Sequence, residues 1–150
     1  MERDTTEIEA AVAQVVLAGR GDAVVAADRD GSIVFWNPGA ERIFGYAADE
    51  AVGRSLDLIV PERQRARHWE GYRRVIAGGN SRYGDGDLLA VPAIRKDGTT
   101  ISVEFTIQAL PGEGGMSGGF VAVLRDVTPR FEEPRALRRR LAEVARDPAS

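Results

Sequence analysis

The sequence contains no cysteine and only one histidine, His68. The absence of cysteine excludes disulfides, thiolate zinc sites, iron–sulfur clusters, c-type haem attachment and a covalent cysteinyl-flavin bond. A single histidine also excludes metal sites built from several imidazoles. If this protein binds a cofactor, we therefore expect it on the segment that carries His68.

Long apolar runs and an excess of one charge sign are also missing. No run approaches the roughly 18 to 20 apolar residues that a membrane-spanning helix needs. The N-terminus, Met1–Asp4, lacks a basic segment followed by an apolar one, so we expect a soluble, cytoplasmic protein with no membrane contact. The net charge of −3, with both signs interspersed, predicts no binding to nucleic acid.

The 150 residues, 43% of them hydrophobic, are typical of one domain with helical extensions. The hydrophobic pattern predicts an amphipathic helix over 6–17, strands over 23–27 and 32–36, short helical turns within 40–53, a helix over 61–76, strands over 88–94, 99–110 and 120–124, and a helix over 134–146. This order favours an α+β domain built on one antiparallel sheet.

The ends of some elements can also be predicted. Thr6 and Glu9 indicate a capping box at the start of the first helix, and Asp49 is the predicted cap of a single helical turn. The turn Asp28–Gly31 joins two short apolar runs and therefore indicates a β-hairpin. Gly45 is expected to close the helical turn before Tyr46.

The helix over 61–76 carries the most informative pattern in the chain. Its apolar face holds His68, Tyr72, Val75 and Ile76 at helical spacing, whereas its arginines lie mostly on the flanks and the far side. A histidine on such a face is either a structural residue or a ligand, and the pattern leaves both possibilities open. No nucleophile, base and orienting group can be assembled elsewhere, so we expect no enzymatic activity.

Several landmarks resemble those of a PAS domain and together cover residues 17–128. In chain order they are Asp30–Gly31, Trp36–Asn37–Pro38 with Ala40, Phe44–Gly45–Tyr46, Glu50 with Val52–Gly53, Arg95–Lys96–Asp97–Gly98 and Arg125–Asp126–Val127–Thr128. The resemblance implies a PAS fold, a five-stranded antiparallel sheet with short flanking helices, used for sensing and dimerisation. The chain would then divide into a leader helix (1–16), a PAS sensor domain (17–128) and a C-terminal helix and tail (129–150).

Within that family, the segment from Pro61–Glu62 to His68 is similar to the haem-bearing helix of oxygen-sensing PAS kinases. This resemblance implies haem b as cofactor and His68 as the axial iron ligand. Arg74 and Arg82 would then contact the haem propionates, and apolar side chains of a later strand would close the distal side. The residues expected around the haem are His68, Tyr72, Arg74, Val75, Arg82, Leu89, Val103, Phe105 and Ile107.

The sequence departs from those kinases at three positions. Trp69 follows the histidine where an aspartate is common, and Tyr72 comes four residues after the histidine instead of three. Leu89 aligns with the distal arginine that donates a hydrogen bond to oxygen in those kinases. The expected ligand is a diatomic gas, and an apolar distal side would favour carbon monoxide or nitric oxide relative to oxygen.

Three functional hypotheses follow: a haem b sensor of gas or redox state, a cofactor-free dimerisation or interaction module, and a PAS pocket for a small organic ligand. We expect a homodimer, because a leader helix of about three turns is marginal alone and needs a partner for its apolar face. That face consists of Ile8, Val12, Val15 and Val16. Any signal is expected to pass through the assembly or to a separate partner, with Phe131–Val144 as the relay.

Overall fold

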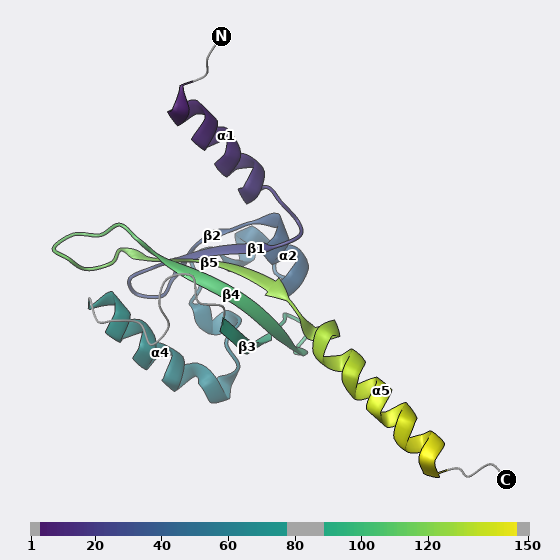
Figure 1. Ribbon diagram of the computed structural model, residues 1–150. Helices are drawn as coiled ribbons and strands as arrows, with labels where there is room; N and C mark the ends of the chain where they lie inside the picture. The colour runs from purple at the N-terminus through teal and green to yellow at the C-terminus, as the bar shows by residue number, and fades with distance from the viewer. Residues whose placement is uncertain (1–3, 78–88, 147–150) are drawn as a thin grey trace.

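The computed structural model describes residues 4–77 and 89–146 (Figure 1). In chain order its elements are α1 (Thr5–Leu17), β1 (Ala23–Asp28), β2 (Ile33–Trp36), α2 (Pro38–Phe44), α3 (Ala48–Ala51), the 3-10 helix η1 (Leu56–Leu58), α4 (Glu62–Ile76), β3 (Leu89–Ile94), β4 (Thr100–Leu110), β5 (Gly119–Asp126) and α5 (Thr128–Arg146). The predicted α+β class and the order of strands and helices are confirmed.

The five strands form one antiparallel sheet in the order β2-β1-β5-β4-β3. The last strand, β5, therefore lies between β1 and β4, so the end of the domain pairs with its beginning. Residues directly opposite each other on paired strands point to the same face of the sheet. Val25 lies opposite Ala122, and Ala122 lies opposite Ile107, so these three side chains share one face. The long segment from α2 to α4 connects the β2 and β3 edges.

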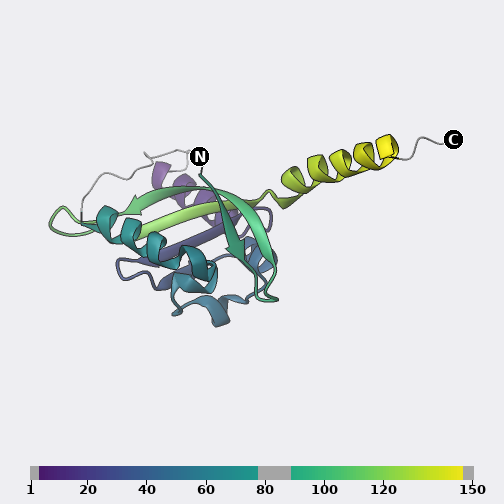
Figure 2. The ribbon, with the colours of Figure 1, turned by 90° about the horizontal axis from the view of Figure 1, so that it is seen from below.

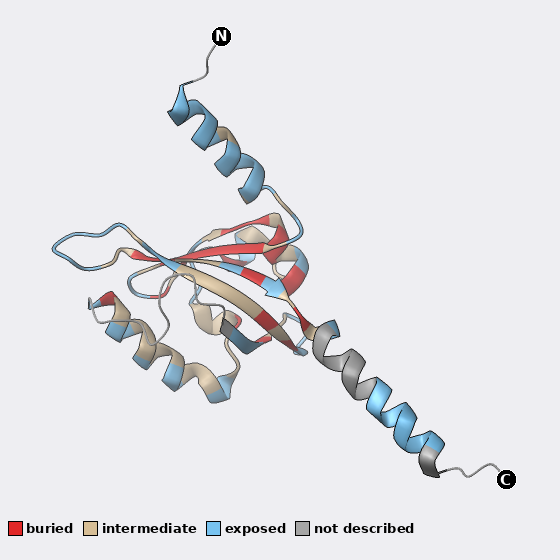
Figure 3. Ribbon diagram, in the orientation of Figure 1, coloured by how far each residue is buried: buried red, intermediate tan, exposed pale blue. Residues whose placement is uncertain are grey.

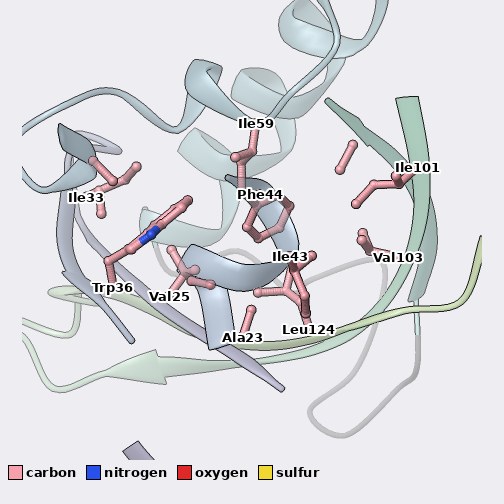
Figure 4. Packing of buried hydrophobic residues seen from close by; sticks show 13 residues of the cluster. Ala23, Val25, Ile33, Trp36, Ile43, Phe44, Ile59, Ile101, Val103 and Leu124 are labelled. Atoms are coloured by element: carbon pink, nitrogen blue, oxygen red, sulfur yellow. The ribbon is translucent and has the colours of Figure 1, made fainter. Parts of the chain in front are cut away.

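The sheet has one covered face and one nearly bare face. The inner face carries Ala23 and Val25 of β1, Leu124 of β5 and Val103 of β4, which pack against Phe44 of α2 (Figure 4). Phe44 is the largest of the core side chains that are fully buried, and Trp36, which is 4% exposed, packs beside it. The short helices α2, α3 and η1 therefore cover the inner face at one end of the sheet.

Asn37 joins β2 to α2 and organises this end of the core. Its side-chain oxygen accepts hydrogen bonds from the backbone N–H of Val24 (2.7 Å) and of Ala40 (2.9 Å), so it caps α2 and ties it to β1. Its amide group donates to the carbonyls of Gly19 and Asp22, each at 3.1 Å. Asn37 is only 1% exposed, and the two hydrogen bonds that its oxygen accepts are buried.

Three predicted boundaries differ from the structure. Asp4, not Thr6, caps α1, and its carboxylate accepts the Thr6 N–H at 3.4 Å. Ala47 is the N-cap of α3, where the Glu50 carboxylate accepts the Ala47 N–H at 2.9 Å, so the cap predicted at Asp49 was wrong. Helix α5 begins at Thr128 and not at 134, because a proline such as Pro129 is tolerated in the first turn of a helix.

Helices α1 and α5 extend from the body of the domain (Figure 1), and α5 continues directly from the end of β5 (Figure 2). Both are largely exposed along their described length, in contrast to β1 (Figure 3). Val15 is 75% exposed and Val144 is 73% exposed, which leaves apolar side chains of both helices without a covering partner. None of the described helices is long and apolar enough to cross a membrane.

Candidate functional site

Helix α4 lies on the inner side of the sheet, where aromatic side chains attach it. The ring centroids of Tyr72 and Phe120 lie 5.2 Å apart, and Phe120 faces inward from β5. The Tyr72 hydroxyl donates a hydrogen bond to the carbonyl oxygen of Asp28, at the end of β1. Burial raises the pKa of Tyr72 to about 12, so the hydroxyl keeps its proton and remains a donor at neutral pH.

Trp69 makes a second attachment, to the turn between β1 and β2 and to η1. Its indole N–H donates to Oδ1 of Asp57 at 2.7 Å. The ring covers Gly31, where an added Cβ would lie 2.1 Å from two ring atoms of Trp69. Trp69 and Tyr72 also contact each other, with ring centroids 5.4 Å apart. Together these two side chains hold α4 in a fixed position over the first hairpin.

His68 lies between these attachments and has no hydrogen-bond partner of its own among the described residues. Its ring centroid is 4.7 Å from that of Trp69 and 5.8 Å from that of Tyr72. The Nδ1 atom is buried and unpartnered, and so is Oε1 of Gln64, one helical turn earlier. Burial lowers the pKa of His68, although the Asp57 carboxylate opposes this shift, so the imidazole is neutral at pH 7.

The predicted apolar residues of β4 share the inner face with this helix. Val103 is buried in the core, whereas Phe105 and Ile107 are only half-buried although they point to the same side of the sheet. Leu89 begins β3 and is paired in register with Phe105. The described residues therefore leave part of the inner face of β4 incompletely covered, on the side of the sheet where α4 and its half-buried Val75 lie.

Only one of the two arginines predicted to contact haem propionates, Arg74, lies within the described residues. Arg74 lies on the exposed side of α4, where its Nη2 atom is 3.3 Å from the Glu70 carboxylate. Arg82 lies outside the described residues. Nothing in the structure tests their predicted role, and both assignments stay predictions.

The sequence alone did not assign Trp69, Asp57 or Gln64 to this site. Trp69 departs from the pattern of the related kinases, and its bond to Asp57 fixes α4. Gln64 places a second unpartnered polar atom beside His68. The spacing of Gln64 four residues before His68 could have indicated a shared helical face, whereas the Trp69–Asp57 bond crosses between elements and left no local signal. Among residues 4–77 and 89–146, no group of three or more His, Cys, Asp or Glu side chains could hold a metal ion.

The described elements therefore form one antiparallel sheet whose inner face is covered by short helices, with α4 attached to the same side. Residues 21–129 match the PAS domain family. Because this match spans most of the chain, the protein belongs to the PAS domain family.

Two curated relatives are named as sensors. The chain is 31% identical over 114 residues to sensor protein FixL of Bradyrhizobium diazoefficiens, a match covering 71% of this chain and 21% of the relative. It is 28% identical over 112 residues to oxygen sensor protein DosP of Escherichia coli, covering 75% of this chain and 14% of the relative. The chain thus spans about a fifth or less of the length of these relatives.

Solved structures share the fold at lower identity. The PAS domain of a protein from Colwellia psychrerythraea superimposes with a TM-score of 0.66 and 21% identity, covering 84% of this chain and 99% of that one. An RNA-binding light-oxygen-voltage receptor gives the same TM-score at 19% identity and covers 100% of this chain and 43% of its own. The predicted PAS fold is confirmed.

Proposed function

We propose that this chain is a haem b sensor domain of the PAS family, a binding module with no enzymatic activity of its own. The observation that carries the proposal is the neutral, unpartnered imidazole of His68 on the inner side of α4. A neutral imidazole with a free nitrogen is the form that binds iron, whereas a structural histidine of the core is ordinarily hydrogen-bonded. The similarity to two sensor proteins supports this proposal.

The residue types on the inner side of the sheet are those expected around a haem. His68 would hold the iron, and the half-buried apolar side chains of Phe105 and Ile107 would cover the opposite side. When bound, haem supplies an iron that takes diatomic gases or changes oxidation state. Tyr72 and Trp69 would keep the imidazole from rotating away, because both are held by hydrogen bonds to other elements.

Titration with haemin, followed by absorption spectroscopy, tests this proposal. We expect one equivalent to bind the wild-type chain and to give a sharp Soret band. His68→Ala should abolish the band or shift it to that of loosely bound haemin, whereas Arg67→Ala, on the exposed side of the same helix, should bind as the wild type does. A wild-type chain that stays colourless with haemin would contradict the proposal.

The proposal also predicts the relative affinities for oxygen and carbon monoxide. This prediction depends on the alignment of Leu89 with the distal arginine of the related kinases. A charge-assisted hydrogen bond to oxygen contributes roughly 1.5 to 3 kcal/mol, which is about one to two decades of affinity. We therefore expect Leu89→Arg to strengthen oxygen binding by about tenfold or more and to change carbon monoxide binding much less. Flash-photolysis rebinding kinetics measure both affinities. Equal effects on both gases would show that the alignment is wrong.

The alternative function, a cofactor-free dimerisation module, is favoured by a separate observation on the outer face. An apolar groove of about 470 Å³ separates α1 from the sheet. It is lined by Ile8, Val12 and Val16 from α1 and by Val24, Val121 and Val123 from β1 and β5. A second copy of the chain that packs its own α1 and sheet against this groove would cover these side chains. The exposed Leu137 and Leu141 of α5 would then pass the signal to a separate partner.

Deletion of residues 1–16 is therefore expected to convert a dimer into a monomer, as measured by size exclusion with light scattering. Because a truncation exposes Val24 and Val123, the paired substitution Val12→Asp with Val16→Asp provides a test that keeps the full chain. We expect it to dissociate the dimer as well. If both variants remain fully dimeric, α1 is not the interface.

A further inference from the structure

A second hollow, of about 370 Å³, lies on a flank of the domain and is not lined by His68. Its walls come from the segment between α3 and η1, from the start of α4, and from the turn between β3 and β4. Four cationic side chains from these three places line it, together with one carboxylate: Arg54, Arg65, Arg95, Lys96 and Asp57.

Two of the four cations are already neutralised by neighbouring carboxylates. Lys96 Nζ lies 2.6 Å from Oε2 of Glu50, and Arg65 Nε lies 4.0 Å from Oδ1 of Asp57. Arg65 also donates to the carbonyl of Val60 at 3.1 Å. These two side chains line the hollow. Because each is paired with a carboxylate, they contribute little net charge to the binding of a ligand.

The other two cations, Arg54 and Arg95, form no ion pair within 4.0 Å among the described residues, although Glu50 lies near enough to attract Arg54 and Asp97 near enough to attract Arg95. Nε of Arg95 is buried and has no hydrogen-bond partner. The nearest carboxylate on the turn, Asp97, accepts instead from the backbone N–H (2.9 Å) and the hydroxyl (2.6 Å) of Thr99. A buried guanidinium N–H without a partner is costly, so this arrangement indicates a missing acceptor.

The backbone that carries these two arginines is fixed by long-range hydrogen bonds. Ile94 N–H donates to the carbonyl of Ile59 at 3.0 Å, and Lys96 N–H donates to that of Phe44 at 2.9 Å, which hold both sides of Arg95. The carbonyl of Arg54 accepts from Ile33 N–H at 2.8 Å. The backbone at Arg54 and Arg95 therefore needs no rearrangement when a ligand arrives, and only the side chains must be ordered.

We propose that this hollow binds a small organic anion through phosphate or carboxylate oxygens. Two guanidinium groups without an ion pair of their own favour an anionic ligand, and the planar fork of donors on arginine suits both oxyanions. The volume of 370 Å³ exceeds what one inorganic ion fills and lies in the range of small-molecule pockets. The ring of Tyr46, which also lines the hollow, offers an apolar surface for the carbon skeleton. The site is independent of haem.

Titrations with succinate and with glycerol 2-phosphate, followed by amide NMR of the full chain at constant ionic strength, test the proposal and distinguish the two oxyanions. We expect saturable shifts of the amides of Ser55, Lys96 and Gly98 with at least one of these probes. Arg54→Gln combined with Arg95→Gln should weaken binding tenfold or more. Arg63→Gln, which removes one charge at an exposed position of α4 as Arg54→Gln alone does in the hollow, should alter it less than twofold.

Two results would overturn the proposal. One is a response that never saturates or that sodium chloride reproduces, because it would reflect screening of surface charge. The other is equal weakening by Arg63→Gln and by the double variant. If the double variant fails to fold, Arg54→Gln alone, at an exposed side chain, is expected to weaken binding at least threefold, and an unchanged affinity would also overturn the proposal.

Discussion

Replacing Gly31 with alanine is expected to lower the free energy of unfolding by roughly 2 to 5 kcal/mol, the sum of backbone strain and overpacking. Gly31 has a φ of +82°, a conformation that side chains with a Cβ disfavour. The added methyl group would also lie 2.1 Å from the ring of Trp69, which is held in place by Asp57. Urea denaturation followed by circular dichroism measures the change.

Gly53 provides the matched control, because its φ is +93° but no atom lies within 4 Å of its added Cβ. Gly53→Ala should therefore show only the strain, roughly 1 to 2 kcal/mol. Combining Gly31→Ala with Trp69→Ala should recover part of the packing loss relative to the sum of the single changes. Equal destabilisation by Gly31→Ala and Gly53→Ala would mean that the Trp69 ring does not limit the space at Gly31.

Asn37→Ala is expected to be the second severe change, with a loss of roughly 3 to 6 kcal/mol, because it leaves several buried backbone groups unsatisfied. The four partners of Asn37 are the N–H groups of Val24 and Ala40 and the carbonyls of Gly19 and Asp22. Water has little access to these groups, since Asn37 is 1% exposed. Thermal and urea unfolding both report the loss.

Ser55→Ala is the control, because the Ser55 side chain also caps a helix but is exposed. The Ser55 hydroxyl accepts the N–H of Asp57 at 3.1 Å in an exposed position, so its removal should cost only about 1 kcal/mol. Asn37→Asp separates the two halves of the Asn37 network, because a carboxylate keeps both acceptor bonds and loses both donor bonds. An Asn37→Ala variant as stable as Ser55→Ala would contradict the assigned role.

Local patterns were sufficient to predict much of the fold. The alternation of Ile101, Val103, Phe105 and Ile107 has the period of a strand, and the structure places these side chains on one face of β4. Gly45 closes α2 in the left-handed conformation, as its position after an apolar turn indicated. The amphipathic pattern of residues 61–76 likewise predicted α4.

Contacts between distant segments could not be predicted in this way. The Tyr72 bond to Asp28 joins residues 44 positions apart, and the Lys96–Glu50 pair joins residues 46 positions apart. Neither has a periodic signal, because each depends on how α4 and the β3–β4 turn dock against the sheet. The hollow on the flank could not be predicted for the same reason, since Arg54 and Arg95 line one hollow only in the folded chain.

The central claim is that His68 supplies the axial ligand of a bound haem. Haemin titration of His68→Gly, with and without free imidazole, tests it most directly, because glycine leaves space for imidazole to replace the lost ring. We predict weak, broad absorption without imidazole and recovery of the sharp wild-type band with it. A His68→Gly variant that binds haem with the wild-type spectrum in the absence of imidazole would contradict the account.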